Sequence, residues 1–143
     1  MSVIAWDGKT LAADKQLTQG STRRITTKIW KHGSVMIAGI GIMTDTLAVK
    51  DWLLSGGKPD DFPIPSDKDH PAGVYVINKN GSIGCYEGTP YPIILEDKKF
   101  ADGSGGAYAA GAMSHGASAR EAVEIACRHD IQCGMGIDVL TFS

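Results

Sequence analysis

The sequence lacks the features that mark membrane, secreted or nucleic-acid-binding proteins. Its 14 basic and 16 acidic residues give a formal net charge of −2, which offers no excess positive charge for nucleic acid or an anionic membrane surface. No apolar run approaches the roughly 18 residues of a membrane span. The N-terminus also lacks the charged and apolar segments of a signal peptide. We therefore expect a cytoplasmic protein that binds neither nucleic acid nor a membrane.

Cysteine and histidine are too scattered to indicate a metal centre. The three cysteines, Cys85, Cys127 and Cys133, are an odd number, and neither they nor the four histidines stand at zinc-ligand spacings. We expect reduced thiols, no metal and no cofactor. A Walker motif is absent too, so any dependence on ATP would have to come from a partner protein.

The chain does have the size and composition of one globular domain. It contains 143 residues, of which 43% are hydrophobic and 21% charged, and we expect residues 1–143 to form a single domain. Glycine is the unusual component, with 18 residues, or nearly twice the average share of about 7%. Such glycines are expected at turns and at close backbone approaches.

Short apolar segments separated by turn residues predict β-hairpins. Three such pairs are segments 3–6 with 10–13, 25–31 with 34–40, and 74–77 with 83–86. Their turns are Asp7-Gly8, His32-Gly33 and Asn80-Gly81. Segment 16–24 is a polar stretch, segment 58–71 holds four prolines and is predicted to be a loop, and segment 137–142 is a final strand.

Three segments have the pattern of helices. Residues 44–54 form the first, with Thr44 or Asp45 as its cap and two glycines at its end. Segment 105–115 carries a stripe of small residues, which predicts close packing, at Ala107, Ala110, Gly111 and Ser114. The third helix, to residue 129, opens with a capping box at 118–121, and its apolar face holds Ala119, Ala122, Val123, Ala126 and Cys127. Strands followed by helices indicate an α+β fold.

Individual motifs are weak when each is taken alone. Segment 39–44 (GIGIMT) lies between a strand and a helix, as a dinucleotide fingerprint does, but Thr44 replaces the third glycine. The GSGG sequence at 103–106 could hold an anion, although a tight turn is the favoured interpretation. Ser2 would gain a free α-amine, of pKa about 8, if Met1 were removed. A serine at the second position is commonplace, however.

Six segments taken together carry more information. They are SVIA at 2–5, LAAD at 11–14, TKIW at 27–30, IAG at 37–39, ADGSGG at 101–106 and RHDIQCGMGIDV at 128–139. With these segments in this order, the chain resembles the proteasome β-subunit and HslV family of N-terminal-nucleophile hydrolases, and the resemblance extends over nearly its whole length. The resemblance implies a four-layer αββα sandwich, in which two facing sheets lie between helical layers.

The resemblance also implies a catalytic site. Ser2 would attack a peptide carbonyl with its own α-amine as general base, once Met1 has been removed. The positive charge of Lys28 would lower the pKa values of that amine and hydroxyl, and Asp14 would hold Lys28 charged and oriented. The Gly39 amide would donate to the oxyanion, and Ser104 and Asp130 would bond around the α-amine.

Substrate and assembly are implied in the same way. Thr18 and Gly41 would grip an extended peptide through the main chain, and Leu17 and Ile37 would line an apolar pocket for the residue before the cut. The subunit would form a homo-oligomeric ring that cleaves unfolded proteins or peptides. An unfoldase ATPase would be its partner.

The chain also departs from the family pattern. Serine replaces the usual threonine nucleophile, Cys133 replaces a serine, and the first hairpin is about four residues shorter. After Leu54 the family's second helix has no counterpart, because the proline-rich segment 58–71 takes its place. Two alternatives therefore stay open. One is a catalytically silent ring-forming scaffold that retains Met1, and the other is an amidohydrolase of small molecules with the same nucleophile.

Overall fold

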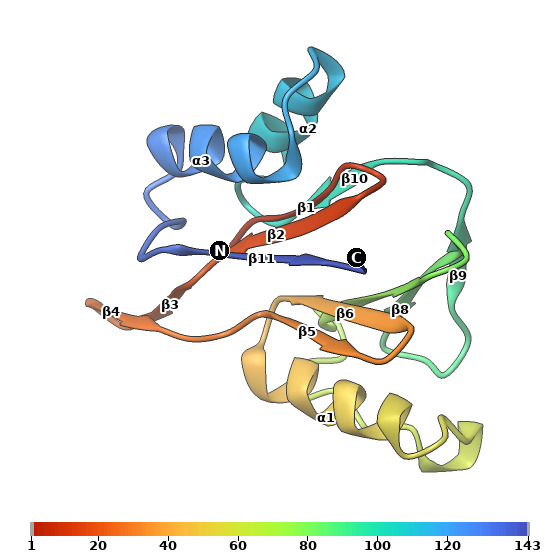
Figure 1. Cartoon of the computed structure of the whole chain (residues 1–143). Coiled ribbons are helices and arrows are strands. Elements are labelled where there is room, and N and C mark those ends of the chain that lie inside the picture. Colours follow the sequence, from red (N-terminus) through yellow and green to blue (C-terminus); the bar gives the residue numbers. More distant parts are fainter. Residues whose placement is uncertain (1, 143) are drawn as a thin grey trace.

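Two antiparallel sheets face each other at the centre of the molecule (Figure 1). The computed structural model describes residues 2–142. One sheet has the order β10-β1-β2-β11, formed by Phe100–Asp102, Ile4–Trp6, Thr10–Asp14 and Ile137–Thr141. The other has the order β5-β6-β7-β8-β9, formed by Ile29–His32, Val35–Ile40, Gly73–Asn78, Ile83–Glu87 and Ile93–Leu95.

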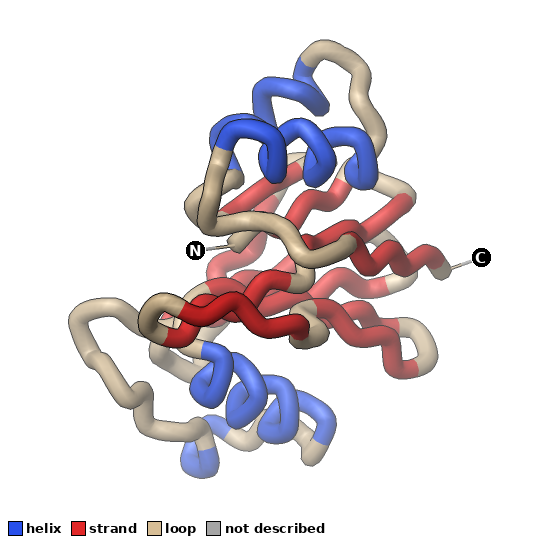
Figure 2. Tube along the Cα trace, turned by 90° about the vertical axis from the view of Figure 1, so that its left-hand side faces the viewer, coloured by secondary structure: helices blue, strands red, loops and turns tan. Residues whose placement is uncertain are grey.

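Helices cover the outer face of each sheet, which completes the four layers (Figures 1 and 2). Helices α2 (Gly106–Ser114) and α3 (Ala119–His129) pack on the four-stranded sheet, and α1 (Met43–Leu54) packs on the five-stranded sheet. Between α1 and β7 the described chain has only a 3-10 turn, η1 (Pro59–Asp61), and loop. The predicted αββα sandwich with one helix missing is therefore confirmed.

The main hydrophobic core lies between the two sheets. Ile4 and Leu11 of the four-stranded sheet meet Met36, Ile77 and Ile83 of the five-stranded sheet, and all five are at most 2% exposed. Because side chains alternate along each strand, the residues between them point outward to the helices. Val3, Ala5 and Ala12 thus pack against α2 and α3.

All three predicted hairpins form, but the second begins later than expected. The strand predicted at 25–31 starts only at Ile29, because Ile25 ends another strand, β4 (Thr22–Ile25). Strand β4 pairs with β3 (Gln16–Gln19), so the segment interpreted as a polar stretch is a hairpin. All four residues of β4 are exposed. An unburied strand needs no alternation of apolar and polar residues, and so its sequence gave no strand signal.

Two details of the predicted helices are wrong. The small residues Ala107, Ala110, Gly111 and Ser114 are exposed, and α2 instead buries Gly106, Ala109 and Met113. The packed face is therefore displaced around the helix from the predicted stripe. Neither Thr44 nor Asp45 caps α1, since the N-cap is Ile42 and the Asp45 carboxylate accepts hydrogen bonds from Ser66. The capping box of α3 is confirmed.

Candidate active site

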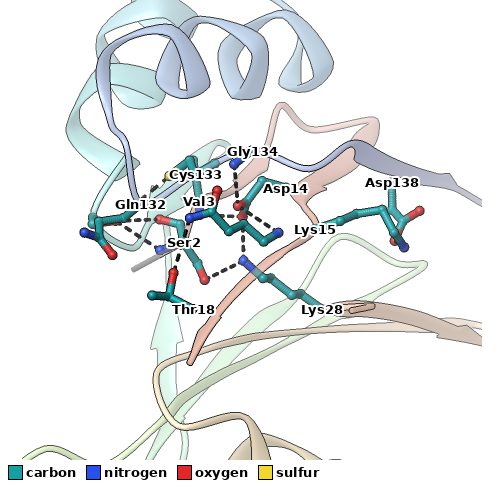
Figure 3. A network of polar contacts seen from close by, with 12 residues as sticks. Ser2, Val3, Asp14, Lys15, Thr18, Lys28, Gln132, Cys133, Gly134 and Asp138 are labelled. Atoms are coloured by element: carbon teal, nitrogen blue, oxygen red, sulfur yellow. Dashed lines mark hydrogen bonds and ion pairs between the residues drawn. The ribbon is translucent and has the colours of Figure 1, made fainter. Parts of the chain in front are cut away.

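Three polar side chains meet at the N-terminal end of β1, between the two sheets (Figure 3). The Lys28 ammonium donates to Ser2 Oγ at 2.7 Å and to Asp14 Oδ1 at 2.7 Å. Asp14 is the last residue of β2, whereas Lys28 directly precedes β5 in the other sheet. The four-stranded sheet therefore contributes Ser2 and Asp14, and the five-stranded sheet contributes Lys28.

The ion pair between Lys28 and Asp14 is buried and its carboxylate is fully bonded. Lys28 is 1% exposed and Asp14 is 0% exposed. Oδ1 of Asp14 also accepts the Val3 amide at 3.1 Å, and Oδ2 accepts the amides of Gln16 at 3.3 Å and Gly134 at 3.0 Å. Charges are held in a protein interior only when they are paired and hydrogen-bonded in this way. The arrangement fixes a positive charge against the Ser2 hydroxyl.

The GSGG sequence forms a turn that holds the main chain of Ser2. Ser104 Oγ accepts the Ser2 N–H at 3.0 Å, and the Gly105 amide donates to the Ser2 carbonyl at 3.0 Å. Gly103 has a φ of +98°, and a Cβ at this position would collide with the Ser2 carbonyl. Only glycine combines this backbone conformation with such a close approach.

Asp130 and Cys133 lie behind Ser104. The Cys133 thiol donates to Asp130 Oδ2 at 3.3 Å and lies 3.9 Å from Ser104 Oγ. Burial, followed by the charge of Asp14 and the bond to Asp130, raises the pKa of the Cys133 thiol to about 12. Partial desolvation raises the pKa of Asp130, but hydrogen bonds from Ser104, Gln132 and Cys133 outweigh it and leave this pKa lowered. The cluster therefore places a neutral thiol and an ionised carboxylate next to the hydroxyl that contacts Ser2 N.

Gly39 lies beside the site, and its main-chain N–H already donates a hydrogen bond. Its N–H donates to the Lys28 carbonyl at 3.1 Å, one residue beyond the paired part of β5 and β6. Its α-carbon faces Thr46 of α1, and a Cβ there would collide with the threonine methyl group. Glycine at this position is therefore required by the packing of α1 on β6.

The four residues expected to bind substrate differ in accessibility. Leu17 and Thr18 lie on β3 and are half-buried. Gly41 has a φ of +104°, and a Cβ on this residue would lie 3.2 Å from Ala72 Cα. Ile37 is only 1% exposed and packs with Val49, Trp52 and Val74 under α1.

Sequence reasoning missed several groups that complete the site. The amides of Val3, Gln16 and Gly134 hold Asp14, but a main-chain donor has no residue-type signature. The side chain of Gln16, 3% exposed, donates to Thr18 Oγ1 and to the Ile131 carbonyl, both at 3.2 Å. It therefore links β3 to the loop after α3. Burial of a glutamine next to Asp14 is not predictable from a polar stretch of sequence.

Residues 2–142 contain no cluster of three or more histidine, cysteine, aspartate or glutamate side chains that could hold a metal ion. None of the helices in the same range is long and apolar enough to cross a membrane.

The layers and the sheet order define a class: the chain has the fold of the HslV and proteasome type of N-terminal-nucleophile hydrolases. HslV from Trypanosoma brucei superimposes with a TM-score of 0.71 at 22% identity, over 97% of each chain. BPH from Thiobacillus denitrificans gives 0.70 at 22% identity, over 99% of this chain and 98% of its own.

A third similar structure is a Gly-1 mutant of Anbu from Hyphomicrobium sp. strain MC1. Its TM-score is 0.72 at 14% identity, and the match covers 100% of this chain and 82% of the Anbu chain. No family profile matches the chain, and no curated protein matches it in sequence. The similarity therefore lies in the fold.

Proposed function

We propose that the protein is an N-terminal-nucleophile peptidase in which Ser2, freed by removal of Met1, attacks the peptide bond. The observation that carries this proposal is the buried Lys28 ammonium, which lies 2.7 Å from both Ser2 Oγ and Asp14 Oδ1. A buried lysine and aspartate are costly to fold and contribute little net stability. Their placement against a serine hydroxyl supports a chemical role, because the positive charge stabilises the oxygen as it loses its proton.

In the proposed mechanism the proton of Ser2 Oγ passes to the α-amine, directly or through a water molecule, as the oxygen attacks the carbonyl carbon. The C–N bond then breaks, the amine returns the proton to the leaving group, and a serine ester remains. Water hydrolyses this ester and regenerates the hydroxyl. Ser104 orients the amine, and Asp130 acts on it through Ser104.

The oxyanion would form near Gly39. Its N–H already donates to the Lys28 carbonyl, so in this mechanism it is shared between that carbonyl and the oxyanion. Three-centre hydrogen bonds of this kind are common in proteins. Oxyanion donors typically contribute about 3 kcal/mol to the transition state, and a shared donor would contribute less.

For the substrate we propose an extended segment of an unfolded protein. Thr18 and Gly41 would hold its main chain, and the half-buried Leu17 would contact the side chain before the cut. Ile37 would provide only the floor of that pocket, because it is 1% exposed. A homo-oligomeric ring, supplied by a separate unfoldase ATPase, is the proposed assembly.

The test is the intact mass of the protein before and after incubation with epoxomicin, a peptide epoxyketone that reacts with a hydroxyl and a free amine together. BPH has been observed in complex with this compound, and it serves as the positive control. We expect loss of Met1 and a single adduct. Ser2→Ala should abolish the adduct and leave the Lys28–Asp14 pair in place.

Lys28→Ala should also abolish the adduct, with circular dichroism to confirm that the variant folds. Lys15→Ala is the matched control, because Lys15 forms a partly exposed pair with Asp138. Full reactivity of Lys28→Ala would disprove the proposed site. Retained Met1 with no adduct, where BPH reacts, would establish a silent scaffold. Cleavage of small amide substrates, together with no cleavage of peptides, would establish an amidohydrolase.

A further inference from the structure

A second polar contact crosses the space between the sheets near Ser2. The Tyr75 hydroxyl, on β7 of the five-stranded sheet, donates to Asp102 Oδ2 on β10 of the four-stranded sheet at 2.5 Å. Tyr75 is 8% exposed, and its ring stacks on Phe100 with centroids 4.5 Å apart. Ring packing alone would be satisfied by phenylalanine, so the hydroxyl and the carboxylate need a separate explanation.

Asp102 directly precedes the turn that holds Ser2. Its other oxygen, Oδ1, accepts the Gly103 amide at 2.7 Å. The next residues then contact the nucleophile, because Ser104 Oγ accepts Ser2 N and the Gly105 amide donates to the Ser2 carbonyl, both at 3.0 Å. One carboxylate thus connects the tyrosine hydroxyl of one sheet to the turn of the other.

The turn has no room to absorb a displacement. A Cβ at Gly103 would collide with the Ser2 carbonyl and lie 3.0 Å from Ile40 Cδ1 of β6. Gly103 is therefore confined between Ser2 and the facing sheet. A shift of Asp102 would be passed on to Ser104 and Gly105 rather than lost in a flexible loop.

We propose that Tyr75 and Asp102 are positioning residues that hold the 103–105 turn, and with it Ser104, in register with Ser2 for catalysis. The inference rests on the proposed function. Lys28 sets the hydroxyl of the nucleophile from the five-stranded sheet, and Tyr75 sets its amine from the same sheet by way of Asp102. Both reacting groups are thereby placed relative to one rigid sheet, as a preorganised site requires.

The Tyr75 hydroxyl is the donor of its hydrogen bond to Asp102 at neutral pH. Burial, and then the bond to and the charge of Asp102, raise the pKa of Tyr75 well above its usual value. The other titratable side chains near Tyr75 are Cys85 and, on the far side of Cys85, Glu87. The tyrosine therefore stays protonated and donates, and Asp102 accepts from both Tyr75 and Gly103.

The test is Tyr75→Phe, which keeps the stacked ring and removes only the hydroxyl. The maximal rate constant of epoxomicin adduct formation should fall about tenfold, because small misplacements of reacting groups are costly. The epoxomicin concentration at half-maximal rate should stay the same, since β3 is untouched. Hydrogen exchange of the 103–105 amides should become faster.

Two further variants make the result specific. Asp102→Asn has one acceptor oxygen for two donors, so it should lower the rate constant by a similar factor. The double variant with Tyr75→Phe should be no slower than the slower single variant, because both changes break one connection. Tyr86→Phe, on the neighbouring strand but facing α1, is the matched control and should leave the rate constant unchanged.

The proposal is overturned if Tyr75→Phe loses thermal stability but keeps the wild-type rate constant and the wild-type exchange of the 103–105 amides. It is also overturned if the two single effects multiply in the double variant. A wild-type protein that forms no adduct would instead disprove the proposed function. In that case hydrogen exchange would still decide whether Tyr75 holds the turn.

Discussion

The two helical layers of this molecule pack on their sheets through side chains of different size. Helix α3 meets the four-stranded sheet through alanines, and Ala119, Ala122 and Ala126 are each 0% exposed. Helix α1 meets the other sheet through Trp52, whose ring lies edge-on to Phe62 at 4.8 Å and to Tyr86 at 5.5 Å. One layer thus consists of a pair of closely packed helices, and the other of a single helix with large aromatic side chains.

This difference in packing explains how the fold accommodates a missing helix. Small residues bring α3 so close that a Cβ at Gly105 would lie 3.0 Å from Ala126 Cβ of this helix. The same Cβ would lie 2.9 Å from Cys133 Sγ in the loop that follows α3. On the opposite side, aromatic side chains and the proline-rich loop fill the space beside α1. Apolar surface nevertheless remains on that side, with Ile64 82% exposed and Leu54 45% exposed.

The largest effect on stability should come from the aromatic layer. Trp52→Ala removes the ring that joins α1 to Phe62 and Tyr86, together with a hydrogen bond from Trp52 Nε1 to the Lys58 carbonyl at 2.8 Å. With one helix in the layer, no neighbour can fill the space. We expect the free energy of unfolding to fall by about 3 to 5 kcal/mol, as measured by urea denaturation.

Leu54→Ala is the control for this prediction, because it lies on the same helix and is 45% exposed. A surface change of this kind should stay within about 0.5 kcal/mol. Similar losses in both variants would show that α1 is held by general hydrophobic burial, and the contrast between the layers would then fail.

In the alanine layer, added volume should be harmful. Ala122→Leu places a longer side chain where α3 meets Val3, Ala5 and Ala12. Overpacking of a close interface costs about 1 to 3 kcal/mol, and the helix should move away from the sheet. The loss should appear as a lower urea midpoint with an unchanged dependence on urea concentration.

Ala107→Leu is the matched control, because Ala107 is exposed on α2. It makes the same chemical change at a site with free space, and its unfolding midpoint should equal that of the wild type. An equal loss in both variants would mean that leucine is unfavourable in these helices wherever it stands, and close packing would not be the cause.

The same contrast explains which parts of the fold were predictable from the sequence. Helix α3 has one apolar face, and its burial matches the predicted residues except for Cys127, which is half-buried. In α2 small residues occur on every side, so periodicity could not separate the buried Ala109 from the exposed Ala110. The projecting hairpin β3–β4 was missed because neither face of β4 is buried.

For the candidate site, the resemblance named side chains that the fold brings together. Ser2, Asp14 and Lys28 are far apart in sequence and meet within hydrogen-bonding distance. Ser104, which the resemblance also named, accepts the Ser2 N–H. Other contacts of the site could not be foreseen. The amides around Asp14 are main-chain groups, and the contact between Tyr75 and Asp102 depends on how two sheets face each other. Local sequence patterns carry no information on that arrangement.

The smallest effect concerns the junction between the first hairpin and the alanine layer. Asp7 accepts the amides of Lys9 and Thr10 within its own turn and, through Oδ2, the amide of Ala119 at the start of α3 at 2.8 Å. Asp7→Ala removes this long-range cap. We expect the free energy of unfolding to fall by about 1 kcal/mol near neutral pH. The effect is small because the Asp7 carboxylate is partly solvated. Chemical denaturation at several pH values measures it.

The pH dependence separates this cap from simple turn formation. Partial burial raises the pKa of Asp7, but the amides of Ala119, Thr10 and Lys9 outweigh this effect and leave the pKa lowered. A lowered pKa stabilises the fold above the unfolded value of about 3.9, and this stability is lost as the pH falls through the folded value. The difference between wild type and Asp7→Ala should therefore shrink below about pH 4. Asp67→Ala, which removes a carboxylate that contacts only two amides and the His70 ring of its own loop, should leave stability unchanged. If Asp67→Ala and Asp7→Ala lose the same stability, the contact between Asp7 and α3 contributes no more than an ordinary turn does.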